Sequence, residues 1–339
     1  MPGTDPLVLD EISLLLVWTA VAIYVLAFIA YAIDLARRSD LALKAKDEIV
    51  ARELVTAGGG GVIDAASPSA ASGTSPARPR YLWARMGTAL TALGFLFHLA
   101  ATVLRGIAAE RVPWSNMYEF ALTGVLLVVA VYLAVLTRYD LRFLGSLITG
   151  LAVVLLGGAT LAFHVEVVPL ADPLKSVWLV IHVFVASLAT ALFALAFGLS
   201  IMQLLQARRE RKLAAAAASP DAAAPRRSFL QTLPTADALE SLAYRFAIVG
   251  FIFWTFTLIA GSIWANDAWG RFWGFDTKEV WTFVIWVLYA GYIHARATRG
   301  WRGTRSAWLS IIGFAAVLFN FTIVNVFFKG LHAYSGLTS

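Results

Sequence analysis

Cysteine is absent from the 339-residue sequence, and charged side chains make up only 14% of it. The lack of thiols excludes disulfide bonds, a dithiol relay within the chain and thiolate metal sites. A bound metal or haem iron would therefore need histidine, methionine or oxygen ligands. The scarcity of charge, beside 60% hydrophobic residues, excludes an ordinary soluble domain of this length and indicates a polytopic membrane protein.

Long apolar runs define the expected spans, since a transmembrane helix needs about 20 such residues. Eight segments qualify, at about 12–34, 85–107, 117–137, 144–164, 176–205, 244–264, 279–297 and 307–328. The sequence therefore predicts an all-α polytopic integral membrane protein with about eight transmembrane helices. We expect the first span to be retained, because acidic residues precede it and because it is too long for a signal-peptide core.

Basic residues indicate the orientation of the chain. They gather in the connections after the first, third, fifth and seventh spans and just before the second. Because positively charged connections stay in the cytoplasm, both termini are predicted to be extracytoplasmic. The outside then carries a Trp-rich loop, WGRFWGFDTKEVW, at residues 269–281.

The composition also divides the chain into five parts, two of them flexible cytoplasmic linkers rich in Gly, Ala, Ser and Pro. The parts are a first transmembrane helix at 1–36, a linker at 37–84, transmembrane helices at 85–206, a linker at 207–243, and three last helices at 244–339 with an external Trp-rich loop at 264–281.

Histidines at membrane depth are costly and therefore suggest function. The five histidines are His98, His164, His182, His294 and His332. His182 lies about 9 Å from the outer end of its span and His332 follows the last span, so both lie at the face of the Trp-rich loop. His294 lies about 24 Å from the outer end of its span. One ligand cannot reach both depths, so two sites are expected if both positions bind a ligand. His98 and His164 fit packing as well as ligation.

The residues around the outer histidines suit a flat apolar ligand with anionic groups. Two neutral imidazoles can supply both axial ligands of a haem iron. Aromatic rings can cover the porphyrin, from Trp264, Trp269, Phe272, Trp273, Phe275 and Trp281. Cations for the propionates are available from Arg271, Lys278 and Arg105. Asp276 and Glu279 could pair with these cations or cap the following helix.

Five stretches in order resemble the cytochrome c assembly, haem-handling proteins with a tryptophan-rich WWD signature. They are VPWSNMYEF, WLVIHV, the Trp-rich loop, YIHAR and NFTIVNVFFKGLHAYSG. The resemblance runs from about residue 85 to 336 and is strongest to the CcsA (ResC-like) branch of the system II haem lyase.

By position, the resemblance implies that His182 and His332 are an external pair of haem ligands and that His294 is a haem ligand within the membrane. The signature positions are matched by Trp269, Gly270, Trp273, Asp276, Lys278 and Glu279. Phe275 departs from the pattern, because the family usually has a Trp there; the stacking face is kept and an indole N–H is lost. Asn116 and Glu119 of VPWSNMYEF join the candidate cofactor-binding residues, with His98 and Arg105.

The resemblance also implies a function. Haem b would reach the outer face of a bacterial cytoplasmic membrane, where its vinyl groups form thioethers with the Cys-x-x-Cys-His motif of apocytochrome c. The chain would be a haem lyase subunit that positions haem, without an assigned acid or base. The implied partners are a Ccs1/ResB-type membrane protein, which completes the His294 site, apocytochrome c and, indirectly, thiol-reducing factors; nucleic acid is not among them.

Two other functions remain open at this point. A dihaem b-type electron-transfer subunit shares the histidines and aromatics, but usually holds each haem between facing helices. A haem transporter without ligation activity would use the two sites as stations along a path.

Overall fold

The computed structural model describes residues 5–57, 81–218, 228–298, 300–328 and 330–332. Within these ranges the chain is helical and contains no strand. The long helices are α1 (Pro6–Ala57), α2 (Leu82–Ala108), α3 (Met117–Leu136), α4 (Gly145–Phe163), α5 (Val177–Ala218), α6 (Ala236–Trp269), α7 (Thr277–Thr298) and α8 (Thr304–Phe319). The short elements are η1 (Arg142–Leu144), η2 (Asp172–Leu174), η3 (Phe229–Thr232), the π-helical η4 (Asn320–Val324) and α9 (Asn325–Phe327).

Seven of these helical segments are long and apolar enough to cross a membrane, among the residues that the structure describes. The eighth long helix, α7, contains two Trp and two Tyr and is less apolar. The prediction of an all-helical, polytopic membrane protein is thereby confirmed.

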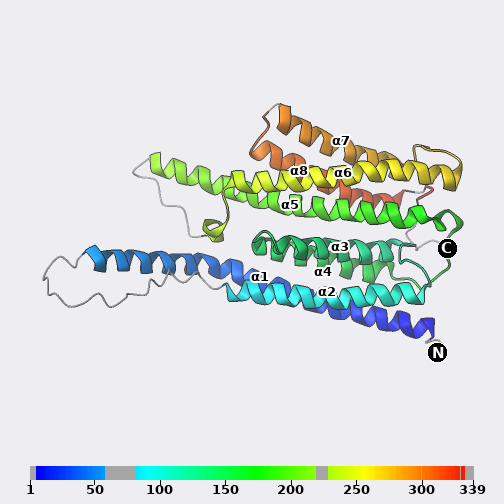
Figure 1. Ribbon diagram of the computed structural model, residues 1–339, viewed down its shortest axis with the longest axis horizontal. Helices are drawn as coiled ribbons and strands as arrows, with labels where there is room; N and C mark the ends of the chain where they lie inside the picture. Colours follow the sequence, from blue (N-terminus) through cyan, green and yellow to red (C-terminus); the bar gives the residue numbers. More distant parts are fainter. Residues whose placement is uncertain (1–4, 58–80, 219–227, 299, 329, 333–339) are drawn as a thin grey trace, which may run out of the picture.

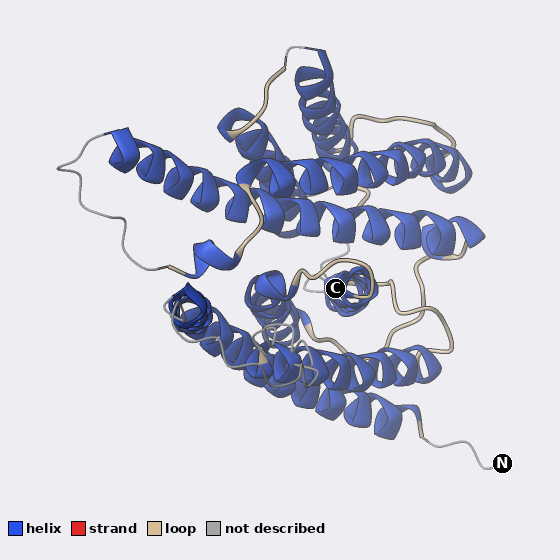
Figure 2. Ribbon diagram, turned by 60° about the vertical axis from the view of Figure 1, so that its left-hand side comes forward, coloured by secondary structure: helices blue, strands red, loops and turns tan. Residues whose placement is uncertain are grey.

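The helices form two groups that run roughly antiparallel to their neighbours (Figure 1). In one group, α1 packs against α2 and α4; in the other, α5 packs against α6 and α8. The groups meet where α3 contacts α5, and Figure 2 shows the same division from another direction. Tyr24 and Leu122 are buried in the first group. In the second, the ring of Phe193 stacks on Tyr289 at 3.7 Å, which attaches α7 to α5.

Three helices are clearly longer than their apolar runs predict. α1 continues to Ala57, α5 continues to Ala218 and α6 begins at Ala236, so part of each expected linker is helical. The extensions are rich in Ala, Leu, Lys, Arg and Glu, which favour helix even without an apolar face. The Gly- and Pro-containing stretches at 58–80 and 219–227, which the sequence predicts as flexible, lie outside the described residues.

The first turn of α1, the α6–α7 loop and the end of α8 lie at the same end of the bundle (Figure 1). This arrangement follows from an even number of antiparallel long helices. It places the Trp-rich loop beside the residues that follow α8.

Candidate functional site

A cavity of about 260 Å³ opens at this end of the bundle, between the two helix groups. Residues of α3 and α4 line one side, and residues of α5, α6, α7 and α8 line the other. Most of the wall is apolar. Of the residues that the sequence predicts for the site, the cavity brings together His182, Trp264, Trp269, Phe272, Trp273, Lys278, Glu279 and His332.

His182 projects into the cavity from the second turn of α5. Its ring meets Trp264 edge-on, with centroids 5.6 Å apart. Its Nδ1 atom is buried and has no hydrogen-bond partner in the described part of the chain. Gly261 of α6 makes room for the ring, since a Cβ there would lie 2.8 Å from Cε1 of His182. A buried imidazole nitrogen without a partner is unusual, and ligation of a metal would satisfy it.

His332 reaches the cavity from the segment after α9 and is held by the α6–α7 loop. Its Nδ1 lies 2.8 Å from Oδ2 of Asp276, and its ring meets Trp269 edge-on at 4.9 Å. The other carboxylate oxygen of Asp276 accepts the backbone N–H of Leu331 at 3.1 Å. A Cβ at Gly330 would collide with Asp276, so this close approach requires glycine. The hydrogen bond from His332 holds the pKa of Asp276 below its usual value.

Glu279 organises the Trp-rich loop from the first turn of α7. Its Oε2 accepts the backbone N–H groups of Gly274 at 2.9 Å and Asp276 at 3.1 Å. Its Oε1 lies 3.3 Å from a guanidinium nitrogen of Arg271. Phe275, between the two bonded amides, has a positive φ of 58° and an exposed ring. The carboxylate thus fixes a loop conformation that the local sequence alone disfavours.

Gly270 ends α6 in the left-handed conformation, with φ 68°, and its N–H bonds to Asn266. This is the usual helix-terminating role of glycine. Neither Gly270 nor Phe275 belongs to the cavity wall; both shape the loop that carries Trp269 and Trp273.

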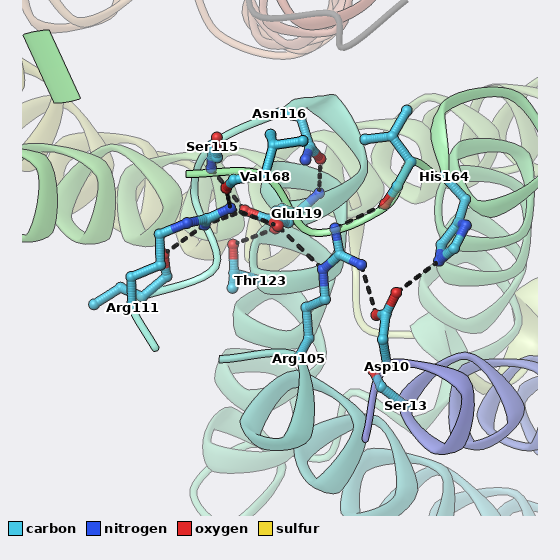
Figure 3. A network of polar contacts seen from close by, with 12 residues as sticks. Asp10, Ser13, Arg105, Arg111, Ser115, Asn116, Glu119, Thr123, His164 and Val168 are labelled. Carbon is cyan, nitrogen blue, oxygen red and sulfur yellow. Dashed lines mark hydrogen bonds and ion pairs between the residues drawn. The ribbon is translucent and has the colours of Figure 1, made fainter. Parts of the chain in front are cut away.

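Arg105 and Glu119 lie instead in a buried ionic network beside the cavity (Figure 3). Both side chains are fully buried, and Nε of Arg105 lies 3.1 Å from Oε1 of Glu119. Arg105 also binds Asp10 of α1 at 2.6 Å, and Arg111 binds the second oxygen of Glu119 at 2.7 Å. Asn116 caps α3 by accepting the N–H of Glu119 at 2.9 Å. The Arg105 guanidinium and the Glu119 carboxylate are bonded to protein groups, and the network joins α1, α2 and α3.

His98 and His164 are also away from the cavity wall. The buried His98 contacts the Tyr24 hydroxyl at 3.3 Å and the carbonyl of Leu122 at 2.8 Å, which is a packed position. His164 follows α4, and its ring meets Tyr118 edge-on at 4.8 Å. Burial lowers the pKa of His164, against the attraction of nearby Asp10.

His294 is exposed on α7, at the opposite end of that helix from the Trp-rich loop. It is 16 residues from Lys278, a rise of about 24 Å along the helix. The structure therefore separates His294 from the pair His182 and His332. This agrees with the expectation that they lie at two different depths along the bundle.

Sequence reasoning missed Asn320 and Asn325 of the last helical segment, which also line the cavity. The sequence does indicate them, because two carboxamides in an otherwise apolar span are costly and therefore suggest a function. Gly261 was missed as well, since only the packing of α6 on α5 shows its relation to His182.

The family model described as "Cytochrome C assembly protein" matches residues 114–332 of the chain. The chain belongs to the cytochrome c assembly protein family. The matched range contains the Trp-rich loop together with His182, His294 and His332, whereas His98 and Arg105 lie outside it.

Named relatives agree with this membership in the cytochrome c assembly family. The "Cytochrome c biogenesis protein CcsA" of Guillardia theta is 34% identical over 242 residues, which cover 69% of this chain and 80% of the relative. The protein of the same name from Synechococcus elongatus is 32% identical over 282 residues, covering 74% and 87%. The resemblance to the CcsA branch is thereby confirmed.

A solved structure, "Cytochrome c Heme Lyase CcmF", shares the fold with a TM-score of 0.57 at 16% identity. The similarity covers 95% of this chain and 47% of that one, so the present chain spans about half of the solved protein.

Proposed function

We propose that the protein holds haem b at the extracytoplasmic face of a bacterial cytoplasmic membrane and attaches it to apocytochrome c. The observation that carries this proposal is that His182 and His332, 150 positions apart in the sequence, line one cavity among Trp rings. Two imidazoles and flat apolar walls are the groups that a bis-histidine haem site requires.

The residues present fit haem as a substrate. The buried Nδ1 of His182 is without a protein partner in the described ranges, and iron would provide one. Asp276 fixes the ring orientation of His332, as carboxylates behind metal-binding histidines commonly do. Trp264 and Trp269 contact the two histidine rings and add apolar surface.

The covalent step would add each cysteine S–H of the apocytochrome motif across one vinyl group of haem, which forms a thioether without a leaving group. The thiols come from the substrate, because this chain has no cysteine. The contribution of the protein is to hold the two reactants in a reactive orientation. The histidine of the incoming motif would then replace His182 or His332 on the iron.

The orientation of the chain supports this assignment. Arg138 and Arg302 belong to connections at the end of the bundle opposite the Trp-rich loop, and Arg208 lies in the last part of α5 toward that same end. Because positive connections remain cytoplasmic, the cavity and both termini would face outside.

His294 would bind haem within the membrane together with a histidine of a ResB-type partner. Its exposure on α7 supports an interaction with another chain. This feature also weighs against a dihaem electron-transfer subunit, which holds each haem between its own helices. Apocytochrome c and, indirectly, thiol-reducing factors complete the set of proposed partners.

The test is to co-express the His182→Ala and His332→Ala variants with the partner and an apocytochrome. We expect both to lose covalent cytochrome c, measured by haem staining after denaturing electrophoresis, and added imidazole to restore part of it. His164→Gln, outside the cavity wall, is the control and should mature cytochrome c normally. Normal maturation in both alanine variants would overturn the ligand assignment.

Two further outcomes favour the alternatives. Haem that is reduced by quinol and stays bound when apocytochrome is supplied would indicate an electron-transfer subunit. Haem movement across liposomes by this chain alone would indicate a transporter.

A further inference from the structure

The helix that begins as α8 changes its winding where it lines the cavity. Asn320–Val324 form a π-helical turn between α8 and α9. In a regular α-helix, residues five apart point about 140° away from each other, whereas the π pattern pairs residue i with i+5. The turn therefore brings Asn320 and Asn325 to the same cavity wall, and such turns are frequent at functional sites.

The two carboxamides are buried, and one of them is incompletely bonded. Asn320 is 6% exposed and Asn325 7% exposed. Nδ2 of Asn320 donates to the Thr282 hydroxyl at 3.4 Å, while its Oδ1 has no partner within the described part of the chain. A buried polar atom without a partner is costly, so a ligand that brings a polar group into the cavity would be stabilised there.

Lys278 adds a positive charge at the same place. Its Nζ donates to Oδ1 of Asn325, whose Nδ2 donates in turn to the carbonyl of Phe321 at 2.8 Å. No salt bridge to Lys278 exists among the described residues. Asp276 is bonded to His332 and Glu279 to Arg271. An ammonium group has three N–H donors, so Lys278 retains donors for a ligand.

Among the described residues that line the cavity, Lys278 is the one lysine or arginine. Rotation of the Asn320 carboxamide by 180°, with the Thr282 hydroxyl turned from the carbonyl of Lys278 to donate to Oδ1, presents an NH₂ group to the cavity. The subsite then offers one cation and one amide donor. A carboxylate matches this set, because charge-assisted hydrogen bonds to ammonium groups are among the strongest that proteins make.

We infer that Lys278, Asn320 and Asn325 form a carboxylate-binding subsite that holds a propionate of haem. This inference rests on the proposed function. It adds the rotational orientation of the haem within the plane of its ring. Propionates and vinyl groups lie on different sides of the porphyrin ring. Anchoring the propionates at the wall of α7 and α8 therefore directs the vinyl groups away from that wall.

The experiment compares two ligands on the purified full-length protein in detergent. Ferric haem and its dimethyl ester have the same iron, ring and vinyl groups, but the ester has no carboxylate. We expect the wild type to bind haem about 10- to 100-fold more tightly than the ester. Absorption titration gives both dissociation constants, and the Soret band reports axial ligation in each case.

Substitutions in the subsite should remove the discrimination. In Lys278→Met, and to a smaller extent in Asn320→Leu, we expect the haem-to-ester affinity ratio to fall to within about threefold of unity, with ester binding retained. Retained ester binding shows that the variant is folded. Lys278→Arg should preserve the preference for haem. Ser310→Ala, buried on α8 but outside the cavity wall, is the matched control.

The results separate this inference from the proposed function. If the wild type binds neither ligand, the proposed haem site is wrong, and the subsite is wrong with it. If the wild type binds both ligands equally with histidine ligation, or if Lys278→Met keeps the wild-type ratio, the haem site stands and the carboxylate subsite is overturned.

Discussion

Nδ1 of His332 lies 2.8 Å from the carboxylate of Asp276, although the two residues are 56 positions apart. This contact joins the segment after α9 to the loop between α6 and α7. It means that the Trp-rich loop and the last histidine form one unit.

Asp276→Asn should weaken the contact with His332 and lower the stability of the protein. The loss of stability relative to the wild type should be larger at neutral pH than at acid pH. The folded-state pKa of Asp276 is depressed, so its stabilising contribution is complete above its unfolded value of about 4 and is lost as pH falls through the folded value. We therefore expect the variant to melt below the wild type at pH 7, and the difference in melting temperature to shrink progressively as the pH falls below about 4. A constant difference at all pH values would contradict the carboxylate role.

Gly261→Ala should displace the His182 ring, because the added methyl group would lie 2.8 Å from its Cε1 atom. A small displacement of a positioned group can have a large effect on function. We expect haem affinity to fall about tenfold or more, measured by absorption titration. Gly158→Ala is the control, since nothing lies within 4 Å of a Cβ at that position of α4. Equal affinities in the two variants would show that Gly261 has no part in the site.

Glu119→Gln should destabilise the fold, because it leaves Arg105 and Arg111 buried beside a neutral side chain. Breaking a buried ion pair typically costs about 3–5 kcal/mol. We expect a clear loss of melting temperature in detergent. Asp172→Asn provides the comparison, since its partner Lys175 and the carboxylate itself are exposed and surface pairs contribute little. A variant as stable as wild type would show that the network of Figure 3 is not structural.

His294→Ala should lower the amount of haem that reaches the outer site in cells, because the proposed entry ligand is lost. Direct titration of the purified variant with haem should be unchanged, since His294 lies outside the cavity wall. The haem content of the co-purified complex, measured as the pyridine haemochrome, gives the cellular value. Normal cellular haem content would exclude a relay through His294.

The helical architecture could be predicted from the lengths of the apolar runs, and family membership from five ordered motifs. The helix ends were less predictable, because residues 37–57 of α1 are polar yet favour helix. The outer histidine pair, with its Trp rings, was predicted to be one site, and the structure lines one cavity with both. Their role as haem ligands stays a prediction.

Arg105 and His98 are residues whose surroundings could not be predicted from the sequence. Both are polar residues at membrane depth, which favours function. Arg105, however, is bonded to Asp10, 95 positions away, and His98 to the carbonyl of Leu122. Such partners come from other helices, and the spacing of residues along one helix does not indicate them. The same limit hid the relation of Gly261 to His182.

Because the cavity lies where α3 and α4 face α5, α6 and α8, neither helix group encloses it alone. The width of the cavity therefore depends on how the two helix groups pack against each other. Where the groups meet, a Cβ on Gly198 of α5 would lie 2.9 Å from Cδ2 of Leu147 of α4, so an added methyl group would have to displace that side chain. Side chains outside the cavity wall can thus influence the width of the cavity.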